Sequence, residues 1–324
     1  MGTGAVGAFI GGRLQAAGGR VHFVGRRRVL DALRGHGLLL TDLDGGRVML
    51  PATALSLDRH PPAVAGALVL LCVKSGATAA AAAALAEVMP AGTPVLSLQN
   101  GVGNVPVATA AAPSLRWLRG MVPFNVAELA AGHWHRGTSG QLAAQAHPAL
   151  DPWLPLFARA GLPLDCRTDL RPLQWAKLLL NLNNPVNALS GLPLRAQLLD
   201  RDCRAATAAL QAEALNLVRR AGIPLARLTP VPPGAMPFVL RLPTPLFRLV
   251  ASRSLRLDAK ARSSMADDLA LGRPTEIDAL CGEVVRLARS LGRTAPLNQR
   301  MVDLLSAPAP QPIGGRALRA ELGI

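Results

Sequence analysis

The sequence of 324 residues predicts an α/β domain followed by an all-helical domain. Three observations support this prediction. Short apolar runs of strand length alternate with helical segments through the first half, a glycine-rich turn precedes the first helix, and from about Leu170 the apolar spacing is helical. Alternating strands and helices favour a parallel sheet with helices on both faces. We expect the domains to occupy residues 1–168 and 169–324.

The elements expected in the first domain follow from local patterns. Helical spacing covers 4–18 and 28–37, and an alanine-rich helix ends at Met89-Pro90. Continuous apolar or β-branched runs of strand length lie at 20–25, 67–74, 93–101, 120–129 and 140–146. We expect the last two runs to form a smaller, antiparallel extension of the sheet.

The second domain is expected to consist of helices that end in glycine or a turn. Helical spacing covers 173–191, 201–222 and 275–292, and a proline-rich stretch at 231–247 interrupts it. The stretch is a candidate for shaping a substrate pocket.

Composition restricts the classes of function. Hydrophobic residues make up 50% of the chain, but the apolar run Val64–Val73 ends at Lys74 and is too short to span a bilayer. No signal-peptide pattern precedes the first glycines, and the four cysteines are far apart in the sequence, as in a reduced cytoplasmic protein. The pair His133 and His135 has no further ligand at metal-binding spacing, so we expect no metal, no disulfide and no membrane.

The net charge of +15 raises the question of nucleic-acid binding. The basic residues are spread along the whole chain, and aromatic residues make up only 3%, so stacking platforms are scarce. We read most of the charge as solvated surface and expect no specific nucleic acid, with weak affinity for polyanions such as phosphorylated cofactors. Salt-dependent retention of duplex DNA would indicate otherwise.

The opening residues match the G-x-G-x-x-G turn of Rossmann-type dinucleotide-binding domains. In such a turn, glycines let backbone amides approach a pyrophosphate at the start of a helix. The candidate cofactor residues are Gly2, Thr3, Gly4, Ala5, Val6 and Gly7. The turn should follow a strand, yet here it begins at residue 2, so the first strand is missing. We expect either a start upstream of Met1 or a damaged copy, and we favour the first.

Arginines follow the second expected strand, at the position where NAD and NADP are distinguished. Arg26, Arg27 and Arg28 occupy it, and no acid occurs before Asp31. Arginine accommodates the additional phosphate of NADP, whereas an acid binds the ribose hydroxyls of NAD. The pattern therefore favours NADPH, with Arg26 as the cofactor ligand. The alternative is a solvated turn.

A narrow polar stripe crosses an otherwise apolar helix at Leu173–Leu189. At about 100° per residue, Lys177, Asn181 and Asn184 fall within roughly 60° of one another. Buried polar groups need partners, so the stripe should line a cleft, unless it is a structural seam against another helix. Pro185 cannot donate to the carbonyl of Asn181 and favours a kink there.

Five motifs, in order, give the chain a resemblance to the ketopantoate reductase (2-dehydropantoate 2-reductase) family, which is NADPH-dependent. They are the glycine turn, CVKSGAT around Lys74, LQNGVGN around Asn100, KLLLNLNNPVNAL from Lys177, and SSMADDLALGRPTEID ending at Asp278. The resemblance covers nearly the whole chain. The last two motifs are specific and the first is generic.

The resemblance implies roles for individual residues. Lys177 is the general acid that protonates the substrate carbonyl oxygen, and Glu276 binds the hydroxyl region of the substrate and supports the lysine. Asn181, Asn184 and Ser264 are substrate contacts, Asn100 joins cofactor to substrate, and Lys74 is a cofactor-side lysine. The spacing of the second asparagine varies in the family, so Asn187 competes with Asn184. The residues alone favour a different reading of Glu276, as an acid in the first turn of a helix with a capping box made by Thr275 and Asp278, and Lys74 could be a solvated strand end.

These observations lead to three functional hypotheses. The first is reduction of 2-dehydropantoate to pantoate with NADPH, in pantothenate and coenzyme A synthesis, at a site in the cleft between the domains. The second is a reductase of another 2-oxo acid. The third is a vestigial cofactor-binding protein. The chemistry suits a lysine in an apolar cleft, where reduced solvation makes it a better acid near neutral pH. The chain is compatible with a homodimer.

Overall fold

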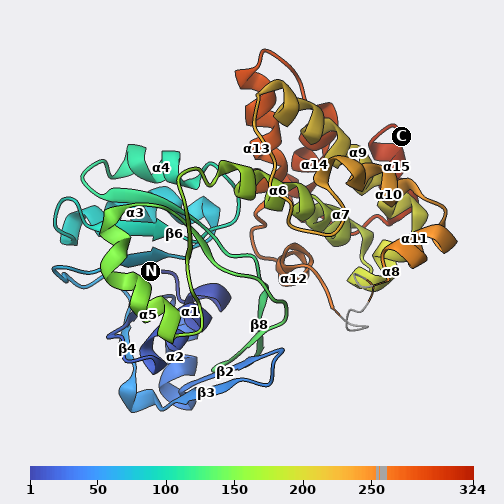
Figure 1. The fold of residues 1–324 in the computed structure, drawn as a ribbon. Helices are drawn as coiled ribbons and strands as arrows, with labels where there is room; N and C mark the ends of the chain where they lie inside the picture. Colours follow the sequence, from blue (N-terminus) through green and yellow to red (C-terminus); the bar gives the residue numbers. More distant parts are fainter. Residues whose placement is uncertain (253–254, 256–260) are drawn as a thin grey trace. The chain divides into compact units, whose positions relative to one another are not determined.

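A computed structural model describes residues 1–252, 255 and 261–324. The chain divides into two compact units, Met1–Leu170 and Arg171–Ile324. Every strand of the described residues belongs to the first unit, and the second unit is built from helices (Figure 1). The predicted fold class, an α/β Rossmann-type domain followed by a helical domain, is confirmed.

The largest sheet of the first unit has five strands in the order β11-β10-β7-β6-β5. β5, β6 and β7 are parallel to one another, β10 is antiparallel to β7, and β11 is parallel to β10. The strands are β5 (Val69–Leu71), β6 (Pro94–Ser97), β7 (Arg116–Met121), β10 (Ala143–Gln145) and β11 (Asp165–Arg167). The antiparallel β10 is the predicted extension of the parallel part.

Helices supply the covering layers of the first unit. Phe9 and Ile10 are buried in one apolar cluster, and Leu85 is buried in a second cluster together with Leu71 and Val95. Each face of the parallel strands thus has its own core, which is why these strands are continuous apolar runs. The helices are α1 (Ala5–Ala16), α2 (Arg27–His36), α3 (Thr78–Val88), α4 (Asn104–Ala111) and α5 (Leu154–Arg159).

A separate four-stranded sheet was not predicted. Its order is β3-β2-β9-β8, with antiparallel pairs β2–β3 and β8–β9 and a parallel pair β2–β9. The prediction of one strand at 120–129 was wrong, because the chain turns at 122–125 and passes from β7 to β8. These strands mix polar and apolar residues, and β8 is largely exposed, so no apolar run marks them. They are β2 (Leu38–Asp42), β3 (Arg47–Leu50), β8 (Val126–Ala130) and β9 (His133–Arg136).

The strands β1 (His22–Val24) and β4 (Ser56–Asp58) form a parallel pair that is not hydrogen-bonded to the five-stranded sheet. Residues Met1–Thr3 connect the two sheets. The amino group of Met1 donates to the carbonyl of Leu70 on β5 (2.9 Å). The amides of Gly2 and Thr3 donate to the carbonyl of Val24 on β1 (2.8 and 3.0 Å).

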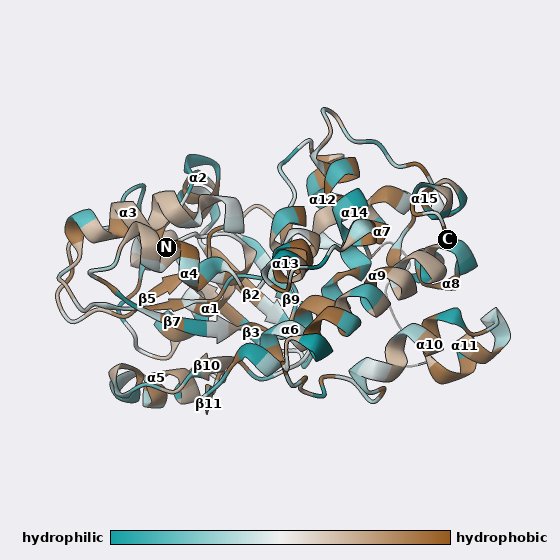
Figure 2. Cartoon of the chain, turned by 90° about the horizontal axis from the view of Figure 1, so that it is seen from above, coloured by the Kyte–Doolittle hydropathy of each residue, from teal (hydrophilic) through white to brown (hydrophobic). Residues whose placement is uncertain are grey.

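The second unit is organised around the 20-residue helix α9 (Arg201–Arg220). α9 packs against α6, α7, α8, α10, α13, α14 and α15. Figure 2 shows that polar and apolar residues occupy different sides of several of these helices, as expected for amphipathic helices around a common core. The other helices are α6 (Arg171–Asn181), α7 (Asn183–Ser190), α8 (Leu194–Leu199), α10 (Met236–Arg241), α11 (Thr244–Val250), α12 (Ser264–Ala270), α13 (Ile277–Ser290), α14 (Pro296–Ser306) and α15 (Gly315–Glu321).

The helix expected at 173–191 is interrupted, as the proline indicated. α6 ends at Asn181 and α7 begins at Asn183, with Leu182 between them. Pro185 is the third residue of α7, where an amide would have no partner inside the helix. The carbonyl of Asn181 therefore receives no hydrogen bond from Pro185, the residue four positions later, which has no amide hydrogen.

Candidate functional site

The three glycines of the opening turn lie in different structural environments, and each environment favours glycine for a different reason. Gly2 has φ +93°, a conformation that favours glycine. A Cβ on Gly7 would collide with the carbonyl oxygen of Gly2, so glycine permits the close approach of α1. A Cβ on Gly4 would meet nothing within 4 Å. Gly4 is thus the position where a ligand could approach the backbone, as the second glycine of such turns requires.

The other residues of the turn have structural contacts. The hydroxyl of Thr3 is buried and donates to the carbonyl of Val24 (3.0 Å), so it fixes the turn to β1. Ala5 and Val6 are half-buried in the first residues of α1. The backbone amides at the start of this 12-residue helix are suited to a pyrophosphate.

Two of the three arginines after β1 are committed to ion pairs. Arg28 forms a bidentate pair with Glu128 (3.0 and 2.9 Å), which raises the pKa of its guanidinium. Arg27 lies 3.4 Å from the carboxylate of Asp31. Arg26 is exposed at the N-cap of α2, two residues after Val24.

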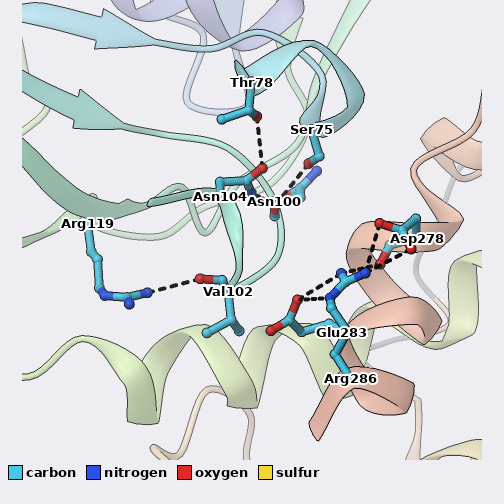
Figure 3. Close-up of polar contacts among 9 residues, drawn as sticks. All are labelled: Ser75, Thr78, Asn100, Val102, Asn104, Arg119, Asp278, Glu283 and Arg286. Atoms are coloured by element: carbon cyan, nitrogen blue, oxygen red, sulfur yellow. Dashed lines mark hydrogen bonds and ion pairs between the residues drawn. The ribbon is translucent and has the colours of Figure 1, made fainter. Parts of the chain in front are cut away.

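A polar network links the ends of β5 and β6 (Figure 3). Ser75 Oγ and Asn104 Nδ2 both donate to the carbonyl of Asn100 (3.3 and 2.6 Å), and Thr78 donates to Asn104 Oδ1 (3.1 Å). Gln99 Nε2 donates to Thr78 Oγ1 (2.7 Å). The network fixes the loop that carries Asn100 at the carboxyl edge of the parallel strands, where open α/β sheets bind ligands.

Four members of this network, Ser75, Thr78, Gln99 and Asn104, were not singled out from the sequence. Thr78, Gln99 and Asn104 are buried neutral side chains, and their role depends on contacts between two loops that are distant in sequence. Their occurrence in or beside the CVKSGAT and LQNGVGN motifs was the only signal. Lys74, also predicted, is the half-buried N-cap of the turn Ser75–Ala77.

Lys177 and Glu276 interact electrostatically in the second unit. Burial lowers the pKa of Lys177 to about 8, and the nearby carboxylate of Glu276 opposes part of that shift. Desolvation destabilises the ammonium form, whereas an opposite charge stabilises it. The result is a lysine that is still mostly protonated at neutral pH but is a stronger acid than an ordinary lysine.

Glu276 lies immediately before α13 and is half-buried. The N-cap of α13 is Glu276 and not Thr275, so the alternative of a capping box made by Thr275 and Asp278 does not match this helix start. Asp278 instead receives two hydrogen bonds from Arg286 Nη1 (2.9 and 3.0 Å), and Arg286 also contacts Glu283 (Figure 3).

The asparagines after Lys177 separate into two groups. Asn181 and Asn184 are half-buried, as side chains that line a site would be. Asn183 accepts hydrogen bonds from Gln197 Nε2 (3.0 Å) and Thr207 Oγ1 (3.4 Å), so it packs α7 onto α8 and α9. Asn187 is fully buried.

Asn187 joins α7 to the segment that carries Ser264. Its Oδ1 accepts from the amide of Ser263 (2.9 Å), and its Nδ2 donates to the carbonyl of Leu192 (2.9 Å). Ser263 Oγ donates to the carbonyl of Asn184 (3.4 Å) and accepts from the amide of Ala266. Ser263 is therefore the buried cap of α12, and Ser264 is the exposed serine of the pair.

The proline-rich stretch faces another side of α6. A small, mainly apolar pocket is lined by residues of α6 and α9 together with Pro233 and Met236. Ala176, Leu179 and Leu180 line it, and at about 100° per residue Ala176 and Leu179 point away from Lys177, whereas Leu180 lies beside the polar stripe.

His133 and His135 both contact the hydroxyl of Thr41, at 2.9 and 2.8 Å. Within residues 1–252, 255 and 261–324, no group of three or more His, Cys, Asp or Glu side chains could hold a metal ion. In the same residues, no helix is both long enough and apolar enough to cross a bilayer.

The first unit has a glycine-rich turn beside parallel strands, and the second unit is helical and carries a lysine with a lowered pKa. These features define the class as a two-domain oxidoreductase with a Rossmann-type first domain. Two family descriptions match the chain. "Ketopantoate reductase PanE/ApbA" matches residues 1–149, and "Ketopantoate reductase PanE/ApbA C terminal" matches residues 169–309. The chain belongs to the ketopantoate reductase family.

Individual relatives agree with this assignment. A 2-dehydropantoate 2-reductase of Halobacterium salinarum is 28% identical, over 94% of this chain and 96% of the relative. One from Mycobacterium tuberculosis is 30% identical, over 78% of this chain and 80% of the relative. The crystal structure of a PanE/ApbA family ketopantoate reductase from Ralstonia eutropha has a TM-score of 0.78 at 28% identity, covering 100% of this chain and 98% of that chain. A D-mandelate dehydrogenase bound to NADH shares the fold at 17% identity (TM-score 0.73).

Replacement of Asn187 tests its structural role. Asn187→Leu leaves the amide of Ser263 and the carbonyl of Leu192 without their partner in a buried site. We expect the free energy of unfolding to fall by about 3 kcal/mol. Urea titration measures the loss. The matched control is Asn184→Leu, a half-buried position on the same helix, for which we expect less than about 1 kcal/mol. Equal losses would contradict the assignment.

Proposed function

We propose that the chain reduces 2-dehydropantoate to pantoate with NADPH, as a step of pantothenate and coenzyme A synthesis. The observation that carries the proposal is Lys177, whose pKa is lowered to about 8 by burial and which is coupled to Glu276. The names of the relatives at 26–30% identity support the substrate. The proposed location is the cytoplasm, a reducing compartment in which free cysteines such as the four of this chain are stable.

We assign binding of the cofactor to the first unit. The open backbone at Gly4 and the amides of α1 would hold the pyrophosphate, and Arg26 would contact the additional phosphate of NADPH. Lys74 and the loop that carries Asn100 would provide further cofactor contacts at the carboxyl edge of the sheet. NADPH supplies the hydride for carbonyl reduction.

The second unit is assigned proton transfer and substrate binding. Lys177 donates its proton to the carbonyl oxygen as negative charge develops there, and Glu276 keeps enough of the lysine protonated while binding the hydroxyl region. Asn181, Asn184 and Ser264 provide neutral hydrogen-bonding groups for the substrate carboxylate and carbonyl. Neutral amides and hydroxyls orient an anion without adding a charge that would lower the pKa of Lys177 further.

The direct test is oxidation of NADPH by the purified chain with 2-dehydropantoate. We expect substrate-dependent loss of NADPH absorbance, and slower turnover of other 2-oxo acids in a substrate panel. Faster turnover of a different 2-oxo acid would overturn the substrate and retain the reductase. No turnover of any member of the panel, from a chain that binds NADPH, would overturn the proposed reaction.

The pH dependence tests the role of Lys177. Reduction requires the ammonium form, so kcat/KM should be flat below about pH 8 and fall above it. Glu276→Gln removes the charge that raises the pKa of Lys177, so the fall should begin at lower pH. Lys177→Ala should lower kcat/KM by at least about a hundredfold without loss of NADPH binding. An unmoved profile in Glu276→Gln, or full activity of Lys177→Ala, would contradict the assigned roles.

Arg26 is tested by cofactor preference. Arg26→Ala should raise the Kd for NADPH about tenfold, the effect of losing one charge-assisted phosphate contact, and leave the Kd for NADH nearly unchanged. Fluorescence titration measures both constants. The control is Arg27→Ala, whose arginine pairs with Asp31. Equal effects of the two substitutions would show that net charge, and no specific contact, determines the preference.

A further inference from the structure

Four large hydrophobic side chains are exposed on the neighbouring helices α10 and α11. They are Phe238 (70% exposed), Leu246 (52%), Leu249 (76%) and Val250 (51%), and we call them the apolar patch. Phe238 and Leu249 are the two most exposed large hydrophobic side chains of the residues that the structure describes. α10 and α11 contact each other, and both views place them on the outside of the second unit (Figure 1 and Figure 2).

The exposure of the apolar patch follows from the way in which the two helices are held. Leu240 of α10 and Phe247 of α11 are buried against Ala208 of α9. At about 100° per residue, Phe238 points roughly 160° away from Leu240, and Leu249 points equally far away from Phe247. Because the buried side chains anchor both helices, the most exposed members of the patch face away from the core.

Arg204 of α9 fixes this arrangement. Its buried guanidinium donates to the carbonyls of Leu240 and Leu242 and to the hydroxyl of Thr244 (3.0, 3.1 and 3.1 Å). A movement of α10 and α11 that covered the patch would leave this buried charge without its hydrogen-bond acceptors, which is costly. The patch is therefore a stable feature of the surface.

The segment that carries the apolar patch is strongly basic. Between Glu213 and Ser252 the sequence has five arginines and no acidic residue, and all five arginines are exposed. Arg241 belongs to α10 and Arg248 to α11. The guanidinium of Arg219 lies beside the start of α10, since a Cβ on Gly234 would be 3.0 Å from its Nη2. The five arginines are Arg219, Arg220, Arg227, Arg241 and Arg248.

Exposed apolar side chains with arginines beside them fit the surface of an anionic membrane. The apolar groups enter the boundary between headgroups and acyl chains, and the guanidinium groups bind the phosphates of the headgroups. A partner helix would instead need a groove, whereas Phe238 and Leu249 are too exposed to line one. A second copy of the chain on the same patch would bring arginines against arginines, which is unfavourable.

We propose that the apolar patch and its arginines bind the surface of a bilayer that contains anionic phospholipid, with Phe238 and Leu249 inserted among the headgroups. The expectation of no membrane rests on the short length of the apolar runs, and an interfacial contact needs no spanning segment. The anionic lipids of a cytoplasmic leaflet would attract the basic segment, and the apolar side chains would hold it there.

Sedimentation of the full chain with vesicles is the first test. Vesicles of phosphatidylcholine mixed with phosphatidylserine should bind the chain at least about tenfold more tightly than phosphatidylcholine alone, and added salt should weaken this binding. The double variant Phe238→Ser, Leu249→Ser should lower the affinity for the mixed vesicles at least about tenfold. The matched control is Leu129→Ser, which changes a side chain of β8 that is 59% exposed and should leave binding unchanged.

Fluorescence quenching tests whether the patch enters the bilayer. Phe238→Trp places an indole in the patch, and lipids brominated in their acyl chains should quench its emission. Leu129→Trp, on β8, should show no such quenching. The chain without substitution has four tryptophans and provides the background signal.

Three results would overturn the proposal. The first is equal binding, or none, with the two vesicle compositions. The second is binding to anionic vesicles that the two serine substitutions leave unchanged, which would show that net charge alone attracts the chain. The third is a dimer that these substitutions convert to a monomer while brominated lipids leave Phe238→Trp unquenched, which would make the patch a subunit interface. Turnover is not measured, so failure here is distinguishable from failure of the proposed reductase activity.

Discussion

The backbone link made by Met1, Gly2 and Thr3 is the constraint on which the first unit depends. These three residues hydrogen-bond to β1 on one side and to β5 on the other. The glycine turn begins from this link, since the amide of Gly4 donates to the carbonyl of Gly2 (2.8 Å), against which Gly7 packs. The position of α1, and hence of its free amides, follows from a few contacts at the centre of the fold.

The second unit buries polar groups inside a helical core, where they need hydrogen-bonding partners if the domain is to stay stable. Most of its buried polar groups have defined partners. The guanidinium of Arg204, fully buried, donates to four main-chain carbonyls and one hydroxyl and lies 4.5 Å from the ring of Phe247. These contacts fix the ends of α8 and α10 and the start of α11 on α9.

The fold class and the long elements could be predicted because they depend on local patterns. α1, α2, α3 and α9 follow from apolar spacing and from terminal glycines. The strands β2, β3 and β9 could not be predicted, since strands of four or five residues with mixed polarity depend on partners distant in sequence. The same limit applies to the site. The helical wheel selects Lys177, Asn181 and Asn184, but only the contact with Ser263 shows that Asn187 is structural.

The composition of the chain gives the lowered pKa of Lys177 a chemical consequence. The sequence contains only three lysines, Lys74, Lys177 and Lys260, because nearly all its cations are arginines. Arginine stays protonated and is a poor nucleophile at neutral pH. With a pKa of about 8, roughly a tenth of Lys177 is free amine at pH 7, against less than about one in a thousand for an ordinary lysine. A substrate-shaped, amine-directed electrophile would therefore label Lys177, which lies on the same polar stripe as Asn181 and Asn184, faster than it labels a lysine of ordinary pKa.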